Sequence, residues 1–259
     1  MVNPAQNEHC MVCGSPLEYL NRGRELVCSY CGKTALGHIH CPEGHFVCEA
    51  CHAADAMAMI EAVSSTTKSK DPLQTAELMM NHPALPMLGC EHAYIAAGAL
   101  MAALRNSPYG TGKITAQDIG EVFARTAKQA AGGYCGLTGI CGVAPAVGAC
   151  VSIFLGARCG SDREQKITMD AVTRVSRAIT ELTGPSCCKA YVRGSLEVAV
   201  NIFAERFGIA FPAGTSPVVC RHSGKHPHGC REEKCPYYKK EETKDISGAI
   251  HLPVAACRS

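Results

Sequence analysis

The chain has 259 residues, a formal net charge of +2 and no tryptophan. This length permits a substantial core, and the near-neutral charge argues against strong attraction to nucleic acid or a membrane. Eighteen cysteines fall into three groups: seven before residue 60, seven between residues 90 and 188, and four from residue 220 onward. Clustering of this kind predicts local sites.

The first ten residues contain no apolar segment of the kind found in signal peptides, so we expect a cytoplasmic protein. In a reducing cytosol, closely spaced cysteines are more often metal ligands or catalytic thiols than disulfides. The apolar stretch 143–155 is too short to span a bilayer and is interrupted by Pro145 and Gly148.

Residues 1–63 predict a Cys/His-rich zinc-binding module. Two Cys-x2-Cys pairs separated by fourteen residues have the spacing of a zinc ribbon, and a second set of donors follows directly. The order of the pairs leaves open whether neighbouring pairs share an ion or alternate pairs do, as in a cross-brace. We expect two zinc ions, which serve folding or grip a partner, and the predicted ligands are Cys10, Cys13, Cys28, Cys31, Cys41, His45, Cys48 and Cys51, with His52 as a further donor.

A polar linker is predicted at 64–72, after a short helix over 53–64. Residues 73–212 show helical periodicity and no useful alternating pattern, which predicts an all-α core. Thr115 and Asp118 resemble a capping box, and Ser161 with Glu164 predicts a second capped start. The expected helices begin near Cys90, after Thr115, near Pro145, after Ser161, and at Cys187 or Cys188.

For residues 213–259 the sequence pattern predicts an irregular Cys-rich tail. The fold class expected is therefore mainly α: a helical core bundle, an N-terminal zinc-ribbon-like module and this tail. Three tail cysteines can hold a cluster with one open position, or a histidine can complete a zinc site, and the two readings stay open. The cysteines concerned are Cys220, Cys230 and Cys235.

Four central cysteines lie in glycine-rich turns that each open a helix. Backbone N–H groups at such starts stabilise thiolates, which favours metal binding, iron–sulfur binding or thiol chemistry. We predict Cys135 and Cys141 as ligands, and we expect the Cys187–Cys188 pair to divide between a ligand, Cys187, and a reactive thiol, Cys188. Cys150 and Cys159 are instead read as packing residues.

Cys90-Glu91-His92 also follows a glycine at a predicted helix start. His92 can act as an acid, a base or a ligand, and Glu91 can orient it. With Cys188 these two residues are the catalytic candidates, while the competing interpretation is a plain surface cap.

These motifs together resemble a family of uncharacterised cysteine-rich proteins from anaerobic bacteria and archaea, some of them fused to SAM-dependent methyltransferases. The resemblance covers most of residues 40–240 and implies a shared cysteine site in an anaerobic, cytoplasmic setting. Family members often have Gly-Pro-Glu-His-His where this chain has Gly-Cys-Glu-His-Ala, so a second histidine is absent. The motifs that carry it are Gly44-His45-x2-Cys48-x2-Cys51-His52, Glu91-His92, Gly133-x-Cys135-Gly136, Gly139-x-Cys141-Gly142, Gly184-Pro185-x-Cys187-Cys188-Lys189, and Cys220 with Cys230 and Cys235-Pro236.

No phosphate-binding loop and no Ser/His/Asp pattern is present, which disfavours nucleotide-dependent and hydrolytic classes. We expect an iron–sulfur protein that acts in sulfur, methyl-group or electron transfer on a small-molecule or sulfur substrate. A methyltransferase or a redox protein is the expected partner. The alternative is a non-catalytic carrier of metal or sulfur, or a docking module for a methyltransferase.

Overall fold

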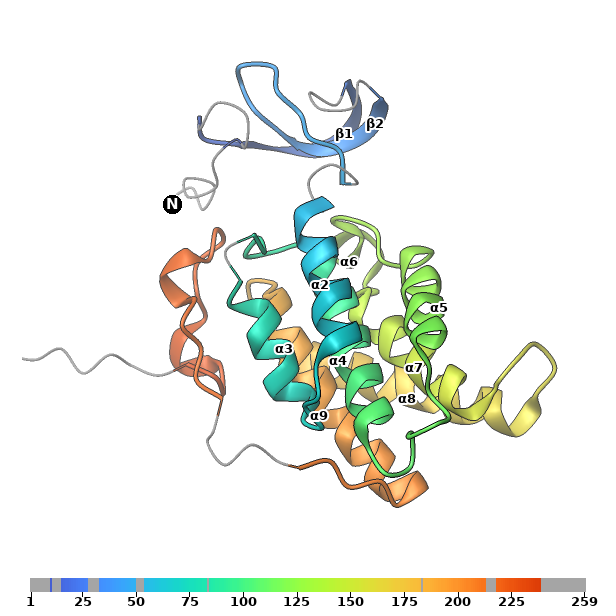
Figure 1. Ribbon diagram of the computed structural model, residues 1–259. Coiled ribbons are helices and arrows are strands. Elements are labelled where there is room, and N and C mark those ends of the chain that lie inside the picture. The colour runs from blue at the N-terminus through green and yellow to red at the C-terminus, as the bar shows by residue number, and fades with distance from the viewer. Residues whose placement is uncertain are drawn as a thin grey trace, which may run out of the picture.

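The computed structural model describes residues 10, 15–27, 33–49, 54–82, 84–182, 184–212 and 218–238. In these residues the protein is mainly helical, with eight α-helices and one small antiparallel sheet (Figure 1). None of these helices combines the length and apolar character needed to cross a membrane.

The sheet is a hairpin of β1 (Glu18–Val27) and β2 (Thr34–His40), with a register shift between Tyr19 and Arg24. It lies at one end of the helical bundle (Figure 1). The sequence did not predict this hairpin, because most of its side chains are at least partly exposed and do not alternate cleanly between apolar and polar.

Helix α4 forms the centre of the bundle. It is apolar on all sides and its interior residues are buried, as expected for a helix surrounded by others. Contacts join it to α2, α3, α5, α7 and α9. The bounds are α2 (Ala54–Thr66), α3 (Pro72–Met80), α4 (Glu91–Asn106), α5 (Ala116–Ala127), α6 (Tyr134–Thr138), α7 (Val143–Leu155), α8 (Asp162–Glu181) and α9 (Cys188–Phe207).

The expected module boundary at residue 63 falls inside helix α2. This helix packs against α4, and Ile60 is part of the main hydrophobic core. The short helix that the sequence predicted therefore belongs to the bundle and not to the Cys/His module.

Local capping signals differ in their outcome. The capping box of Thr115 and Asp118 is present, with each side chain bonded to the other residue's backbone. The predicted cap at Ser161 is wrong: its side chain makes no capping bond to α8 and accepts a hydrogen bond from the Arg158 backbone N–H instead. The Ser161 hydroxyl therefore stabilises the preceding turn.

We expect Thr115→Ala to lower the free energy of unfolding by about 1 kcal/mol, because it removes one half of the capping box. Urea denaturation followed by circular dichroism measures this loss. Thr173→Ala, on the exposed side of α8, is the control and should change stability by less than about 0.5 kcal/mol. Equal effects of the two changes would contradict the capping argument.

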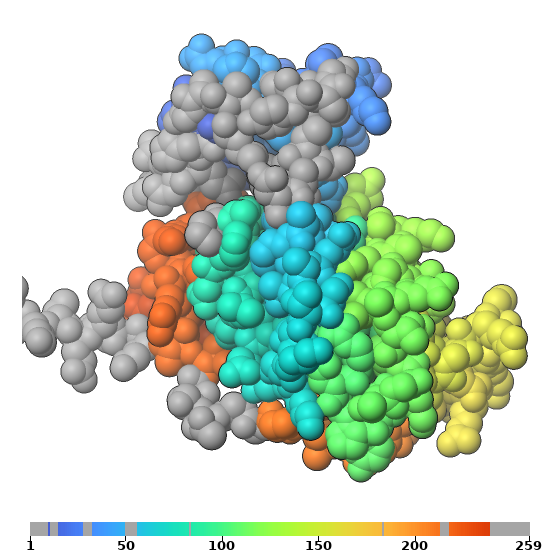
Figure 2. All heavy atoms as spheres, in the orientation of Figure 1, coloured from blue at the N-terminus to red at the C-terminus, as the bar shows by residue number. Residues whose placement is uncertain are grey.

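The tail adds two 3-10 turns, η1 (Ser223–Lys225) and η2 (Glu232–Lys234), where no element was expected. It packs along the side of the bundle next to α3 (Figure 2). The His222 ring bonds the Asn81 side chain at 3.0 Å, and the His226 ring bonds the Ser186 carbonyl at 3.0 Å. These bonds hold the tail over the start of α9.

Candidate metal centres

Three donors of the N-terminal module meet: Cys10, Cys41 and His45. Their ligand atoms all lie within 4.8 Å of one another, and both cysteines are buried. Nδ1 of His45 is buried and has no hydrogen-bond partner within the described part of the chain. A buried imidazole nitrogen without a partner beside two thiols fits a metal ion, because an unsatisfied buried polar atom is otherwise costly.

A tight turn shapes this group. The Cys41 N–H donates to the His45 carbonyl at 2.9 Å, and Gly44 accommodates a φ of +85° that other residues rarely adopt. Cys10 belongs to the first Cys-x2-Cys pair, and it meets Cys41 and His45, which follow the second pair in the sequence. This fits the alternate arrangement, in which pairs that are not neighbours in the sequence share an ion. Cys48, three residues after His45, is also buried. The predicted ligands Cys13, Cys28, Cys31 and Cys51 lie outside the described residues.

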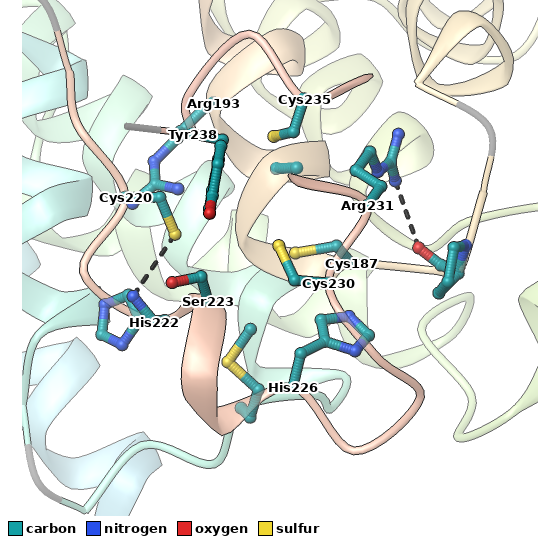
Figure 3. Close-up of a pocket in the computed structure, with 13 residues that line it drawn as sticks. Cys187, Arg193, Cys220, His222, Ser223, His226, Cys230, Arg231, Cys235 and Tyr238 are labelled. Atoms are coloured by element: carbon teal, nitrogen blue, oxygen red, sulfur yellow. Dashed lines mark hydrogen bonds between the residues drawn. The ribbon is translucent and has the colours of Figure 1, made fainter. Parts of the chain in front are cut away.

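Four cysteines from two distant segments line one cavity. We call these residues the tail set: Cys187, Cys220, Cys230 and Cys235. Figure 3 shows their side chains directed toward the same space. The cavity volume is ≈ 20 Å³. This is room for about one water molecule.

Backbone amides bond the sulfurs of the tail set. The N–H groups of His222 and Glu232 donate to Cys220 and Cys230, each at 3.4 Å and each from two residues further along the chain. Burial raises the pKa of Cys187, and the thiols of Cys220 and Cys235 add to this, while the Ala190 amide opposes it. The Cys187 thiol therefore holds its proton until a cation replaces it, so metal binding there would release a proton.

Positive side chains surround the tail set. Arg193 is 1% exposed, lies over the Tyr237 ring at 5.4 Å and bonds Cys220. Arg231 bonds the Pro185 carbonyl at 3.2 Å and also lines the cavity (Figure 3). Burial, with Arg193 nearby, lowers the pKa of Lys189 to about 8. Such cations favour an anionic metal–thiolate group.

The remaining predicted ligands, Cys135 and Cys141, do not line the cavity of the tail set. They lie near Cys188 instead: burial raises the pKa of Cys188 to about 12, and Cys141 and Cys135 are the nearest thiols that add to it. The predicted cluster ligands thus fall into two groups, the tail set and the cysteines near Cys188. Cys150 is fully buried between α4 and α7, as expected, whereas Cys159 is exposed, unlike the prediction.

The catalytic candidates Glu91 and His92 are both buried at the start of α4. The His92 ring bonds the Gly89 carbonyl at 3.1 Å, and burial lowers its pKa to about 3. Nε2 of His92 has no partner among the described residues. The imidazole is therefore neutral at ordinary pH, and neither residue is an exposed cap.

Sequence reasoning missed Arg193 and Lys189 as parts of this region. Lys189 follows the cysteine pair, and its ammonium group donates to the Met80 carbonyl at 2.7 Å. Both residues are buried on α9, four positions apart. The signal available in the sequence was the presence of two cationic residues on one apolar helix face. Such residues are rarely buried without a partner, so this pattern indicates buried partners for both.

The fold and the cysteine sites define a cysteine-rich, mainly helical protein in which one group of described residues, Cys10, Cys41 and His45, could hold a metal ion. The model of a family of unknown function, DUF5714, matches residues 60–238, and the chain belongs to this family. The match starts within α2 and ends with the tail, so it spans the bundle and every cysteine of the tail set. Neither a curated protein nor a solved structure matches the chain.

Proposed function

We propose that the tail set binds an iron–sulfur cluster and that the protein transfers electrons. The observation that carries the proposal is the arrival of Cys187 beside the three tail cysteines, which supplies four thiolates to one cavity. The sequence left the fourth position either open or filled by a histidine. Four protein ligands instead favour electron transfer over chemistry at an open iron.

The tail set does not form the close group of donors that a single zinc ion needs. Four thiolates around one zinc ion bond it at ~2.3 Å and must lie close together. No three donors of the tail set, all of them described, lie within 4.8 Å of one another. A cluster needs wider spacing, because several iron and sulfide atoms lie between its ligands.

The chain's own residues would set the properties of this centre. A bound cluster supplies reversible one-electron transfer. The amides of His222 and Glu232 and the guanidinium of Arg193 stabilise negative charge on the sulfurs. Hydrogen bonds to the sulfurs and nearby positive charge both raise a reduction potential.

We assign zinc to the Cys10, Cys41 and His45 group, since two thiolates and one imidazole within such close range suit a tetrahedral ion. Its role would be to fold the hairpin module. The expected partner is a redox protein or a methyltransferase in the cytoplasm of an anaerobe.

A non-catalytic docking or carrier role is the second candidate. It is favoured by exposed apolar side chains on the hairpin, where Val27 and Leu36 are each 61% exposed. Isolated large apolar residues are common on surfaces, but several on one hairpin favour a partner.

Anaerobic purification with iron, sulfide and zinc analysis tests the proposal. We expect equal amounts of iron and sulfide, an absorbance band near ~400 nm that bleaches with dithionite, and loss of iron in Cys220→Ser. Cys159→Ser, at an exposed thiol, is the control and should keep its iron. Zinc alone in the wild-type protein would reject the proposal, and iron that cannot be reduced and reoxidised would favour the carrier role.

A further inference from the structure

The adjacent cysteines Cys187 and Cys188 face different groups of thiols. Cys187 precedes α9 in extended backbone conformation (φ −126°, ψ 102°), and Cys188 is the first helical residue. The thiols that influence Cys187 most are Cys220 and Cys235, while those for Cys188 are Cys141 and Cys135. The pair therefore belongs to two sites and not to one.

The second group lies where the starts of three long helices meet. Cys90 caps α4, Cys141 comes just before the cap of α7, and Cys188 opens α9. A Cβ at Gly142 would be 3.6 Å from the Cβ of Ala93, so the starts of α4 and α7 touch. With Cys135 on α6, we call Cys90, Cys135, Cys141 and Cys188 the core set.

Backbone amides bond the sulfurs of the core set as they do those of the tail set. Cys141 accepts a hydrogen bond from the Val143 amide, two residues further along, which repeats the pattern at Cys220 and Cys230. Cys188 accepts one from the Gly89 amide. Two sites thus provide the same environment for sulfur, and the positive ends of the helices add to it.

The thiols of the core set are partly buried and lie close enough to influence one another. Burial raises the pKa of Cys141 to about 11 and that of Cys188 to about 12, with further increases from neighbouring thiols. Burial also raises the pKa of Cys90, to which Glu49 and Cys188 contribute. As in the tail set, no three of these sulfurs, all described, lie within 4.8 Å of one another.

The core set lies close beneath the surface. The glycine-rich loop that carries Cys135 and Cys141 exposes Leu137 and Ile140 to 59% and 60%, and Gly133 and Gly139 turn it through positive φ angles. All four cysteines of the core set are themselves partly exposed, so exchange of metal or electrons with the outside does not require the bundle to open.

We propose that the core set binds a second iron–sulfur cluster, separated from the first by the peptide bond between Cys187 and Cys188. The proposal rests on the proposed function for its chemistry, but it concerns different ligands. It gives Cys188 the role of a ligand in place of the reactive thiol expected from the sequence.

Metal analysis of matched serine variants of the full chain, purified anaerobically, tests the proposal. We expect Cys187→Ser and Cys188→Ser each to lose about half of the wild-type iron, and Cys141→Ser to lose the same half as Cys188→Ser. Cys159→Ser is the control for cysteine replacement, and circular dichroism confirms that each variant is folded. If Cys141→Ser and Cys188→Ser keep all the iron while Cys220→Ser loses it, the second site is rejected and the first stands.

Electron paramagnetic resonance of the reduced wild-type protein gives a test that needs no variant. Two nearby reduced clusters couple magnetically, so we expect a broadened signal that integrates to about two spins per protein. Cys141→Ser should give a simpler signal of about one spin. A single uncoupled spin in the wild type, or a Cys135–Cys141 disulfide found by mass spectrometry of the anaerobic protein, would overturn the proposal. Absence of iron altogether would reject both proposals.

Discussion

His45→Ala is expected to release zinc and unfold the hairpin module while the helical bundle persists. The His45 side chain is one of three converging donors, and the buried apolar side chains in the described part of the module all belong to cysteines. Structural zinc supplies on the order of 10 kcal/mol of apparent folding free energy in small domains. Zinc analysis and amide hydrogen exchange at β1 and β2 measure the loss, and circular dichroism should retain the helical signal.

His38→Ala is the matched control, because His38 lies on β2 outside the donor group. We expect it to keep its zinc and its protected hairpin amides. Chelation of zinc from the wild-type protein should reproduce the His45→Ala result. A hairpin that stays protected after the zinc is gone would contradict a structural role for the ion.

Glu77→Gln is expected to lower the free energy of unfolding by about 3 kcal/mol. The Glu77 carboxylate accepts two hydrogen bonds from Arg193, at 2.6 and 2.9 Å, and Arg193 is almost wholly buried. The change leaves a buried guanidinium without its counter-charge, and neither the Tyr237 ring nor Cys220 can replace it. Urea denaturation measures the loss.

Glu205→Gln provides the comparison, since Glu205 also forms two hydrogen bonds to an arginine, Arg174, but at the surface. We expect a clearly smaller loss there, because solvent screens an exposed pair. Equal losses of unfolding free energy in the two variants would show that burial of Arg193 does not increase the cost of removing its carboxylate partner.

The helical bundle was largely predictable because its signals are local. The capping box at Thr115 and the start of α9 at Cys188 both lie where the sequence indicated. The hairpin was not predictable in this way, because its strands are mostly exposed and lack a continuous apolar face. The bond from Ser161 to Arg158 shows how a local alternative can replace an expected cap.

The candidate sites were predictable as residues but not as groups. Sequence indicated that Cys187 and Cys188 divide their roles, yet it could not show which thiols each one meets. That depends on where the tail returns to the bundle, which Asn81, Ser186 and Pro185 determine through bonds to His222, His226 and Arg231. Partners so far apart in sequence leave no spacing signal.

The extended residue at the start of α9 has a consequence for assembly. Because Cys187 and Cys188 are covalently joined, ordering this turn for one set of thiols also orders a ligand of the other. The conformational entropy is then lost once for two binding events, so filling either site should raise the affinity of the other. The protein would pass between empty and fully loaded forms with few half-loaded molecules between them.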